Sequence, residues 1–329
     1  MSEALPAWLS PVWSWLAPAL TADRLGHALL FVGPPGVGKR RLADTLARAL
    51  LCQSPGADGL PCGECRACAQ MAAGSHPDYA ELTPEEGARD IRVAQTRAFG
   101  RKLSLTAHYH RRVGLIDPAE AFTAGAANSL LKTLEEPPAG AHILLVSERP
   151  SAVLATIRSR CQRIRVPLPA PAEAEAWAAG RDPAVAAALP LARGAPLRAE
   201  ALAEAGAGER HAQWWDDLEA LLGGRAPPPE VAERWNAGPH AELLDWLYLT
   251  AGDVLKRAAG VPPEGWVQRD YAQRLKNVAE SIDVNRLRRT VNVIVETRRL
   301  LSTNVDRQLM WEALAIELWV SRQRGGSKR

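Results

Sequence analysis

The stretch Phe31-Val32-Gly33-Pro34-Pro35-Gly36-Val37-Gly38-Lys39-Arg40 decides the fold of this chain. It has the G-x-x-x-x-G-K spacing of a loop whose backbone N–H groups surround a phosphate while the lysine neutralises the outer oxygens. The position after the lysine should carry a Ser or Thr that holds Mg²⁺, but it carries Arg40, whose guanidinium has no lone pair for a metal. The sequence therefore predicts a degenerate nucleotide site without hydrolysis, in which the phosphate-contacting candidates are Gly33, Gly36, Gly38 and Lys39.

The residues on either side of the loop support this interpretation. Residues 28–32 are a short apolar run typical of a buried strand, and Leu42, Leu46 and Leu50 recur at helical spacing after the loop. The motif requires this order of strand, glycine loop and helix. A simple turn between two core elements is the plainer alternative, and the flanking pattern disfavours it.

A second apolar strand, residues 113–116, ends at Asp117. In nucleotide motors such an aspartate helps to hold magnesium, and the next residue is usually the glutamate that positions the attacking water. Here the next residue is Pro118, and Glu120 is displaced by two positions. Taken alone, Asp117 fits a strand-end cap nearly as well as a metal ligand. Together with Arg40, it indicates a site that has lost two groups needed for turnover.

Four of the five cysteines, Cys52, Cys62, Cys65 and Cys68, lie in a Gly- and Pro-rich insertion at 52–68. Two-residue gaps allow neighbouring thiolates to face one tetrahedral ion, so a structural Cys₄ zinc site is the leading interpretation. An iron–sulfur cluster also uses such spacing, but Ala72 stands where the usual fourth cysteine would be. Unligated thiols are the third alternative, and a disulfide is disfavoured in a reducing compartment.

Strands expected at 79–82, 113–117, 143–146 and 164–166 alternate with helices expected at 91–105, 126–136 and 151–160. This order predicts an α/β fold with a parallel sheet covered on both faces. Prolines at 167, 169 and 171 mark a boundary. We expect domains at 1–168, 169–206 (small and helical) and 207–329 (all helical), with a broad apolar face formed by Leu309, Leu314, Ile316, Leu318 and Trp319.

The composition restricts the function classes. The chain has 329 residues, 47% of them hydrophobic, and 40 Lys and Arg against 37 Asp and Glu give a net charge of only +3. That charge does not favour a dedicated nucleic-acid or membrane-surface protein. The N-terminal stretch has neither a basic lead nor an unbroken apolar run, so we expect no signal peptide, no membrane span and a cytoplasmic location.

Several motifs resemble the clamp-loader branch of the AAA+ proteins. They are the phosphate loop, the cysteine insertion, His76-Pro77-Asp78-Tyr79, the string at 130–138 (Leu-Leu-Lys-Thr-Leu-Glu-Glu-Pro-Pro) and Ser159-Arg160-Cys161. The resemblance covers residues 1–168 strongly and the helical remainder by length and arrangement. It implies an AAA+ P-loop domain with a zinc insertion, a helical lid domain and a helical collar for oligomerisation.

Subunits of that family differ at these motifs. The motor subunits keep the loop Ser/Thr and the Asp-Glu pair, whereas the clamp-opening subunit generally lacks both the Ser-Arg-Cys triplet and the cysteines. This chain has the triplet, the cysteines and an altered nucleotide site. The resemblance therefore implies a subunit without ATPase activity of its own that belongs to the bacterial DNA polymerase III holoenzyme.

The resemblance also implies site residues and partners. Arg160 would reach into the nucleotide site of a neighbouring subunit as an arginine finger, and Arg198 would lie where the motors have a second nucleotide sensor. Within a helix end, Arg160 could instead pair locally, and Arg198 could be an ordinary surface arginine. The implied partners are the gamma/tau motor subunits and the delta subunit in a hetero-pentamer, together with the sliding clamp and primed DNA.

Two alternatives remain open at this stage. In the first, the chain is an active motor in which Glu120 and water replace the missing groups. In the second, the cysteine insertion and the basic clusters near Arg111, 158–165 and 286–299 bind DNA directly.

Overall fold

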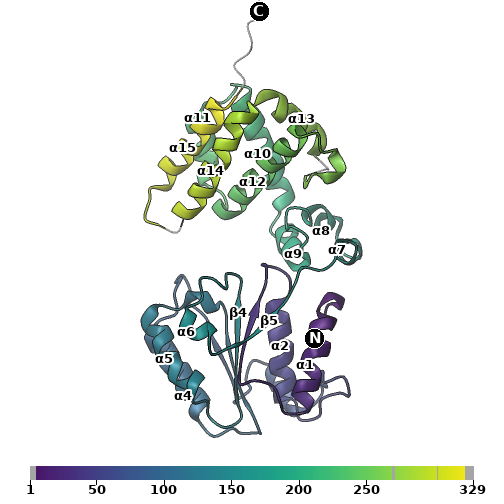
Figure 1. The fold of residues 1–329 in the computed structure, drawn as a ribbon, viewed down its shortest axis with the longest axis vertical. Helices are drawn as coiled ribbons and strands as arrows, with labels where there is room; N and C mark the ends of the chain where they lie inside the picture. The colour runs from purple at the N-terminus through teal and green to yellow at the C-terminus, as the bar shows by residue number, and fades with distance from the viewer. Residues whose placement is uncertain (1–4, 269–270, 302, 323–329) are drawn as a thin grey trace, which may run out of the picture. The chain divides into compact units, whose positions relative to one another are not determined.

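The computed structural model describes residues 5–268, 271–301 and 303–322 (Figure 1). The chain divides into two compact units, one ending at Ala174 and the other beginning at Glu175. The first unit contains the phosphate loop and the cysteines, and the second is helical. The expected boundary near 168 is close to this division, while the further boundary between 206 and 207 stays a prediction.

The first unit is built on a parallel sheet. Its described strands pair in the order β2-β3-β4-β1-β5, and every pair is parallel. The sheet was therefore predicted correctly, because buried apolar strands alternating with helices require parallel crossovers. The strands are β1 (Ala28–Val32), β2 (Tyr79–Leu82), β3 (Arg112–Ile116), β4 (Ala141–Ser147) and β5 (Gln162–Arg165).

Helices cover both faces of this sheet. Figure 1 shows α4, α5 and α6 on one side and α1 and α2 on the other. All residues of β1, β3 and β4 are buried, as expected for central strands between two helical layers. The helical elements are η1 (Ala7–Leu9), α1 (Ser10–Thr21), α2 (Lys39–Leu51), α3 (Arg66–Ala72), α4 (Val93–Ser104), η2 (Ala119–Ala121), α5 (Ala124–Glu135) and α6 (Ala155–Arg158).

The helix expected at 151–160 is shorter in the structure. Leu154 has an extended backbone, with φ −53° and ψ 135°, so α6 begins only at Ala155 and ends at Arg158. Val153 and Ile157 still pack into the core of the sheet face covered by α4 and α5. The apolar pattern was correct, but a turn rather than a helix carries its first half.

Asp78, from the His-Pro-Asp-Tyr motif, connects the beginning of β2 to the beginning of β3. Its carboxylate accepts hydrogen bonds from the backbone N–H groups of His108 (2.8 Å) and Tyr109 (2.9 Å). Its Oδ1 atom also lies 3.4 Å from the guanidinium of Arg112, the first residue of β3. The Asp78 side chain has no exposed surface, so this motif residue is an internal anchor.

The second unit is a helical assembly around a tryptophan-rich core. Trp214, Trp215, Trp235, Trp246 and Trp311 are at most 5% exposed and pack together in this core. Its helical elements are α7 (Pro171–Ala179, which spans the division), α8 (Pro183–Ala188), α9 (Pro196–Glu204), α10 (Ala207–Leu222), α11 (Pro228–Asn236), α12 (His240–Ala258), η3 (Pro263–Gly265), α13 (Ala272–Ser281), α14 (Val284–Leu300) and α15 (Arg307–Val320).

The broad apolar face predicted on the last helix is not a single buried face. Leu314 and Leu318 are buried, whereas Leu309 is 63% and Ile316 48% exposed. The inward side of α15 is the stripe of Met310, Trp311, Leu314, Ala315 and Leu318. Counting apolar residues without separating the two sides of the helix made the predicted face too wide.

Candidate functional site

The phosphate loop connects β1 to α2 at the carboxyl edge of the parallel sheet, where ligands bind in such folds. Gly36 and Gly38 have φ angles of 72° and 96°, in the left-handed region that favours glycine. Gly33 is required for another reason. A Cβ atom at this position would lie 2.2 Å from the carbonyl oxygen of Val166, just after β5. The structure therefore brings the predicted loop glycines together in one tight turn.

Lys39 is the first residue of α2 and is 3% exposed. Its Nζ atom donates a 2.6 Å hydrogen bond to the carbonyl oxygen of Pro34 and lies 3.6 Å from Oε1 of Glu148. Burial lowers the pKa of Lys39, and the Glu148 carboxylate partly opposes this shift. The lysine is thus held within the loop, next to the residue that follows β4.

Arg40 contacts three carboxylates from three different elements. Its Nε atom lies 2.9 Å from Asp44 on α2, and its Nη2 atom lies 2.8 Å from Glu81 on β2. Its Nη1 atom lies 3.3 Å from Oδ2 of Asp117, after β3. Burial lowers the pKa of Arg40, but the Asp44 and Glu81 carboxylates outweigh burial and raise it. The sequence predicted a missing metal ligand here, and the structure shows a cation bound among carboxylates.

Asp117 and Glu120 have different surroundings. Burial raises the pKa of Asp117, and its hydrogen bond with Arg40 opposes that rise. The Glu120 side chain is 4% exposed, and its Oε1 atom accepts hydrogen bonds from the backbone N–H groups of Glu148 (3.2 Å) and Arg149 (3.1 Å). Glu120 therefore braces the loop after β4, a structural task that the sequence did not reveal.

A tryptophan from the N-terminal segment also contacts the phosphate loop. The indole N–H of Trp8, in η1, donates a 2.9 Å hydrogen bond to the carbonyl oxygen of Val37. Trp8 is 5% exposed and Val37 is fully buried. This contact joins residues 29 positions apart, and no local motif around Trp8 indicated it.

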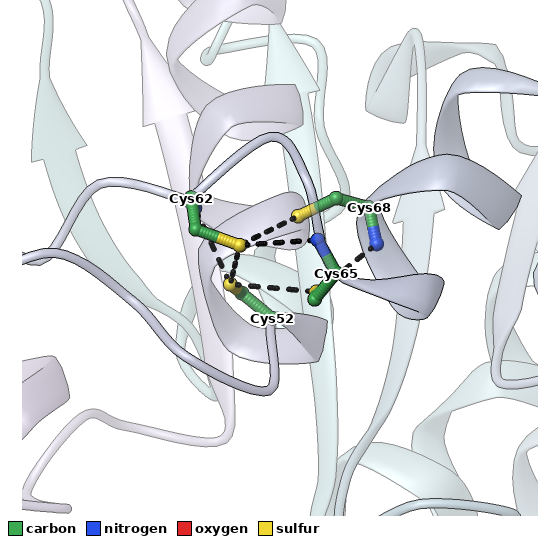
Figure 2. A group of neighbouring side chains, drawn as sticks. All are labelled: Cys52, Cys62, Cys65 and Cys68. Carbon is green, nitrogen blue, oxygen red and sulfur yellow. Dashed lines mark hydrogen bonds between the residues drawn. The ribbon is translucent and has the colours of Figure 1, made fainter.

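The four cysteines predicted as metal ligands form one cluster (Figure 2). All four sulfur atoms lie within 4.8 Å of one another. Cys52 lies 3.5 Å from Cys62 and 3.9 Å from Cys65, and Cys62 lies 3.9 Å from Cys68. Four thiolates at about 2.3 Å from a tetrahedral zinc ion are separated by roughly 3.8 Å, so the residues fit zinc.

Backbone groups favour the thiolate form of two of these cysteines, Cys62 and Cys65, whereas burial raises the pKa of Cys52 and Cys68. The N–H groups of Cys62, Cys65 and Cys68 each lie 3.4 Å from the sulfur of another cluster cysteine. Burial raises the pKa of Cys65, but the backbone N–H groups of Gln53 and Cys68 outweigh it and lower the pKa to about 6. A thiolate is the form that ligates a metal. With four protein ligands a zinc ion would have no open position, so its role would be structural.

We expect the purified chain to contain about one zinc ion, because four converging thiolates complete a tetrahedral shell. Cys65→Ser should lose most of this zinc and make residues 53–64 more sensitive to protease, as measured by elemental analysis and limited proteolysis. Cys161→Ser is the matched control, since Cys161 lies outside the cluster and burial raises its pKa to about 12. Full zinc retention in Cys65→Ser, or iron in the wild type, would contradict the assignment.

Arg160 follows α6 and its side chain is 34% exposed. Its Nε atom donates a 2.8 Å hydrogen bond to Oε1 of Glu135, and its Nη2 atom contacts the same oxygen. Its Nη1 atom donates to the carbonyl oxygen of Thr156 (2.9 Å). Glu135 belongs to the string at 130–138, so the structure joins two motifs that the sequence singled out separately.

Arg198 belongs to the second unit, on α9. Its Nη2 atom donates a 2.7 Å hydrogen bond to Oδ2 of Asp245 on α12, a carboxylate that Arg193 and Arg298 also contact. Arg198 is therefore part of an arginine cluster around one buried carboxylate. Its contact with a nucleotide stays a prediction.

The five-stranded parallel sheet, the glycine loop at its carboxyl edge and the following helix define an α/β protein of the P-loop class. Two family models match the chain. The model described as "DNA polymerase III, delta subunit" matches residues 9–169, and that described as "DNA polymerase III, delta subunit, C terminal" matches residues 209–319.

Two relatives match nearly the whole chain. The DNA polymerase III subunit delta prime of Pseudomonas aeruginosa is 36% identical, over 98% of this chain and 98% of its own length. The subunit of the same name from Escherichia coli is 32% identical, with 94% of each chain covered. This chain therefore belongs to the family of DNA polymerase III delta prime subunits.

A solved structure agrees with this fold. The gamma subunit-related protein of Thermotoga maritima superposes with a TM-score of 0.51 at 18% identity, covering 94% of this chain and 99% of its own. This similarity supports the fold class alone. Within the described residues, none of the helices combines the length and apolar character needed to span a membrane.

Proposed function

We propose that this chain is a non-hydrolysing end subunit of the clamp loader, and that it supplies Arg160 to the ATP site of a neighbouring subunit. The observation that carries the first half is Arg40, which is bonded to Asp117 where a motor would hold magnesium. No carboxylate follows Asp117 directly, because residue 118 is proline. A chain that lacks both groups contributes to ATP-driven clamp loading through its contacts rather than through its own turnover.

The second half rests on the position of Arg160. A guanidinium is planar, permanently charged and able to donate two parallel hydrogen bonds, which suits the oxygens of a transferring phosphoryl group. Arg160 is partly exposed, and the groups that hold it lie on its own unit. If Arg160 released Glu135 and bound the phosphate oxygens of a neighbouring subunit's ATP, its positive charge would still be compensated.

The implied partners are the gamma/tau motor subunits and the delta subunit, in a pentamer that opens the sliding clamp and closes it on primed DNA in the cytoplasm. The cysteine cluster would hold a structural zinc ion. The phosphate loop would hold ATP or ADP without hydrolysing it, through backbone N–H groups and Lys39. The resemblance supports the partners, the location and the nucleotide. The converging thiols support the zinc ion, and the relatives' names support a place in DNA polymerase III.

The two alternatives have less support. Oε1 of Glu120, the base required by a motor, is already engaged by two backbone N–H groups. Of the arginines proposed to bind DNA, Arg111 pairs with Asp23 at 2.7 Å and Arg286 donates to the carbonyl oxygen of Val320 at 2.7 Å. No observation on the described residues favours either function over that of a loader subunit.

The isolated chain is expected to hydrolyse ATP no faster than its Lys39→Ala variant, because the metal ligand and the water-positioning carboxylate are both missing. Steady-state phosphate release, measured with excess magnesium and with primed DNA present, checks this. An active gamma/tau subunit is the positive control. Turnover that Lys39→Ala abolishes would show that the chain is a motor and refute the non-hydrolysing assignment.

A further inference from the structure

The magnesium site that a phosphate loop normally provides does not fit the residues of this chain. In a motor, the Ser or Thr after the loop lysine and an aspartate at the end of a neighbouring strand hold the ion. Here the corresponding positions are Arg40 and Asp117, and they contact each other at 3.3 Å. The guanidinium has donors only, so the pair of groups that should share a metal instead forms a salt bridge.

The arginine is fixed by more than this one contact. Asp44 at 2.9 Å and Glu81 at 2.8 Å receive its other two nitrogens, so all three guanidinium nitrogens face carboxylates. The three carboxylates come from α2, β2 and the end of β3. A divalent ion approaching Asp117 would have to displace this permanently charged group or lie beside it, and both are unfavourable.

The rest of the phosphate loop and its neighbouring residues keep groups that suit a phosphate. The loop glycines allow close backbone approach, and Lys39 is buried at the start of α2. Ser147 ends β4, where it pairs in register with Val32, the residue immediately before the loop. Ser147 has no exposed surface, and its hydroxyl has no hydrogen-bond partner within the described structure. A buried hydroxyl of this kind at a phosphate loop is an unused donor.

We propose that Arg40 replaces magnesium as the cation of this loop, so that the loop accepts a nucleoside phosphate without a divalent metal and gains no affinity from one. The inference builds on the proposed nucleotide occupancy and names the form of nucleotide that is bound. A monovalent guanidinium compensates less charge than Mg²⁺ does. Binding should therefore be weak and salt-sensitive, and magnesium should not tighten it.

The test is a titration of the purified chain with a fluorescent ATP analogue, in excess magnesium and in EDTA. For the wild type we expect measurable binding of equal affinity in both, within about twofold, and no binding in either would overturn the proposal. Arg40→Thr restores the metal-ligating hydroxyl and removes the blocking cation. It should bind the analogue at least about tenfold more tightly in magnesium than in EDTA. Mn²⁺ titration followed by electron paramagnetic resonance should show a nucleotide-dependent metal site in Arg40→Thr only.

Controls separate charge from position. Arg41→Thr removes an equal charge from the next residue, and its affinity for the analogue should remain independent of magnesium. Lys39→Ala in the Arg40→Thr background should abolish binding of the analogue. Magnesium that tightens binding to the wild type by tenfold or more would overturn the proposal. So would an Arg40→Thr variant that is folded by circular dichroism and gains no magnesium-dependent binding. Neither result bears on Arg160, whose role is measured at a neighbour's site in the assembled complex.

Discussion

Arg160→Ala is expected to slow ATP hydrolysis at the neighbouring subunit's site by on the order of 10³-fold, the lower end of what arginine fingers contribute. The physical reason is the loss of a fixed positive charge beside a transferring phosphoryl group. The steady-state rate of the complex sums over all of its ATP sites, so it would underestimate a loss at one of them. The measurement is therefore a DNA-stimulated single-turnover assay on the assembled loader.

Two variants distinguish a finger from a general effect on charge or folding. Arg158→Ala removes a nearby arginine whose Nη1 atom donates to the carbonyl oxygen of Pro150, and it should leave the rate nearly unchanged. Arg160→Lys keeps the charge but loses the planar fork, so most of the rate should still be lost. An assembled Arg160→Ala complex that hydrolyses ATP and loads clamps normally would eliminate the trans-finger role.

The sequence predicted the features that depend on neighbouring residues. The strand, glycine loop and helix at 28–51 follow from local apolar spacing and from positions that tolerate only glycine. The cysteine cluster follows from close spacing within one insertion, because a short segment has few ways to separate its thiols. The alternation of strands and helices was sufficient to predict a parallel sheet.

Contacts between distant segments were not predictable in this way. Arg40 reaches Asp117 across 77 positions, and Glu81 joins them only because β2 lies beside β3 in the sheet. Arg160 meets Glu135 across 25 positions because α6, which directly precedes Arg160, packs against α5. The sequence showed that Arg40 cannot hold a metal, but only the strand order shows which carboxylates surround it.

Asp78 illustrates the same limit and gives the prediction with the largest expected effect on stability. The motif His76-Pro77-Asp78-Tyr79 marked this residue as notable, yet its role depends on backbone N–H groups 30 and 31 positions away. Arg112, which its carboxylate faces at 3.4 Å, is only 7% exposed. Removal of the carboxylate would leave these two N–H donors without their acceptor. It would also leave the guanidinium without its counter-charge, while its nitrogens still donate to the carbonyl oxygens of Lys102 and Thr106.

Asp78→Ala is therefore expected to destabilise the first unit by about 3–5 kcal/mol, the usual cost of leaving one member of a buried ion pair alone. This should lower the melting temperature of that unit by roughly 10 °C. Circular dichroism melts check this, with Asp78→Asn expected to be intermediate because its amide oxygen still accepts one hydrogen bond.

Asp23→Ala is the matched control. Asp23 is 81% exposed and also pairs with an arginine, so its loss should cost about 1 kcal/mol or less. Equal melting of the Asp78→Ala and Asp23→Ala variants would show that the anchor does not stabilise the fold.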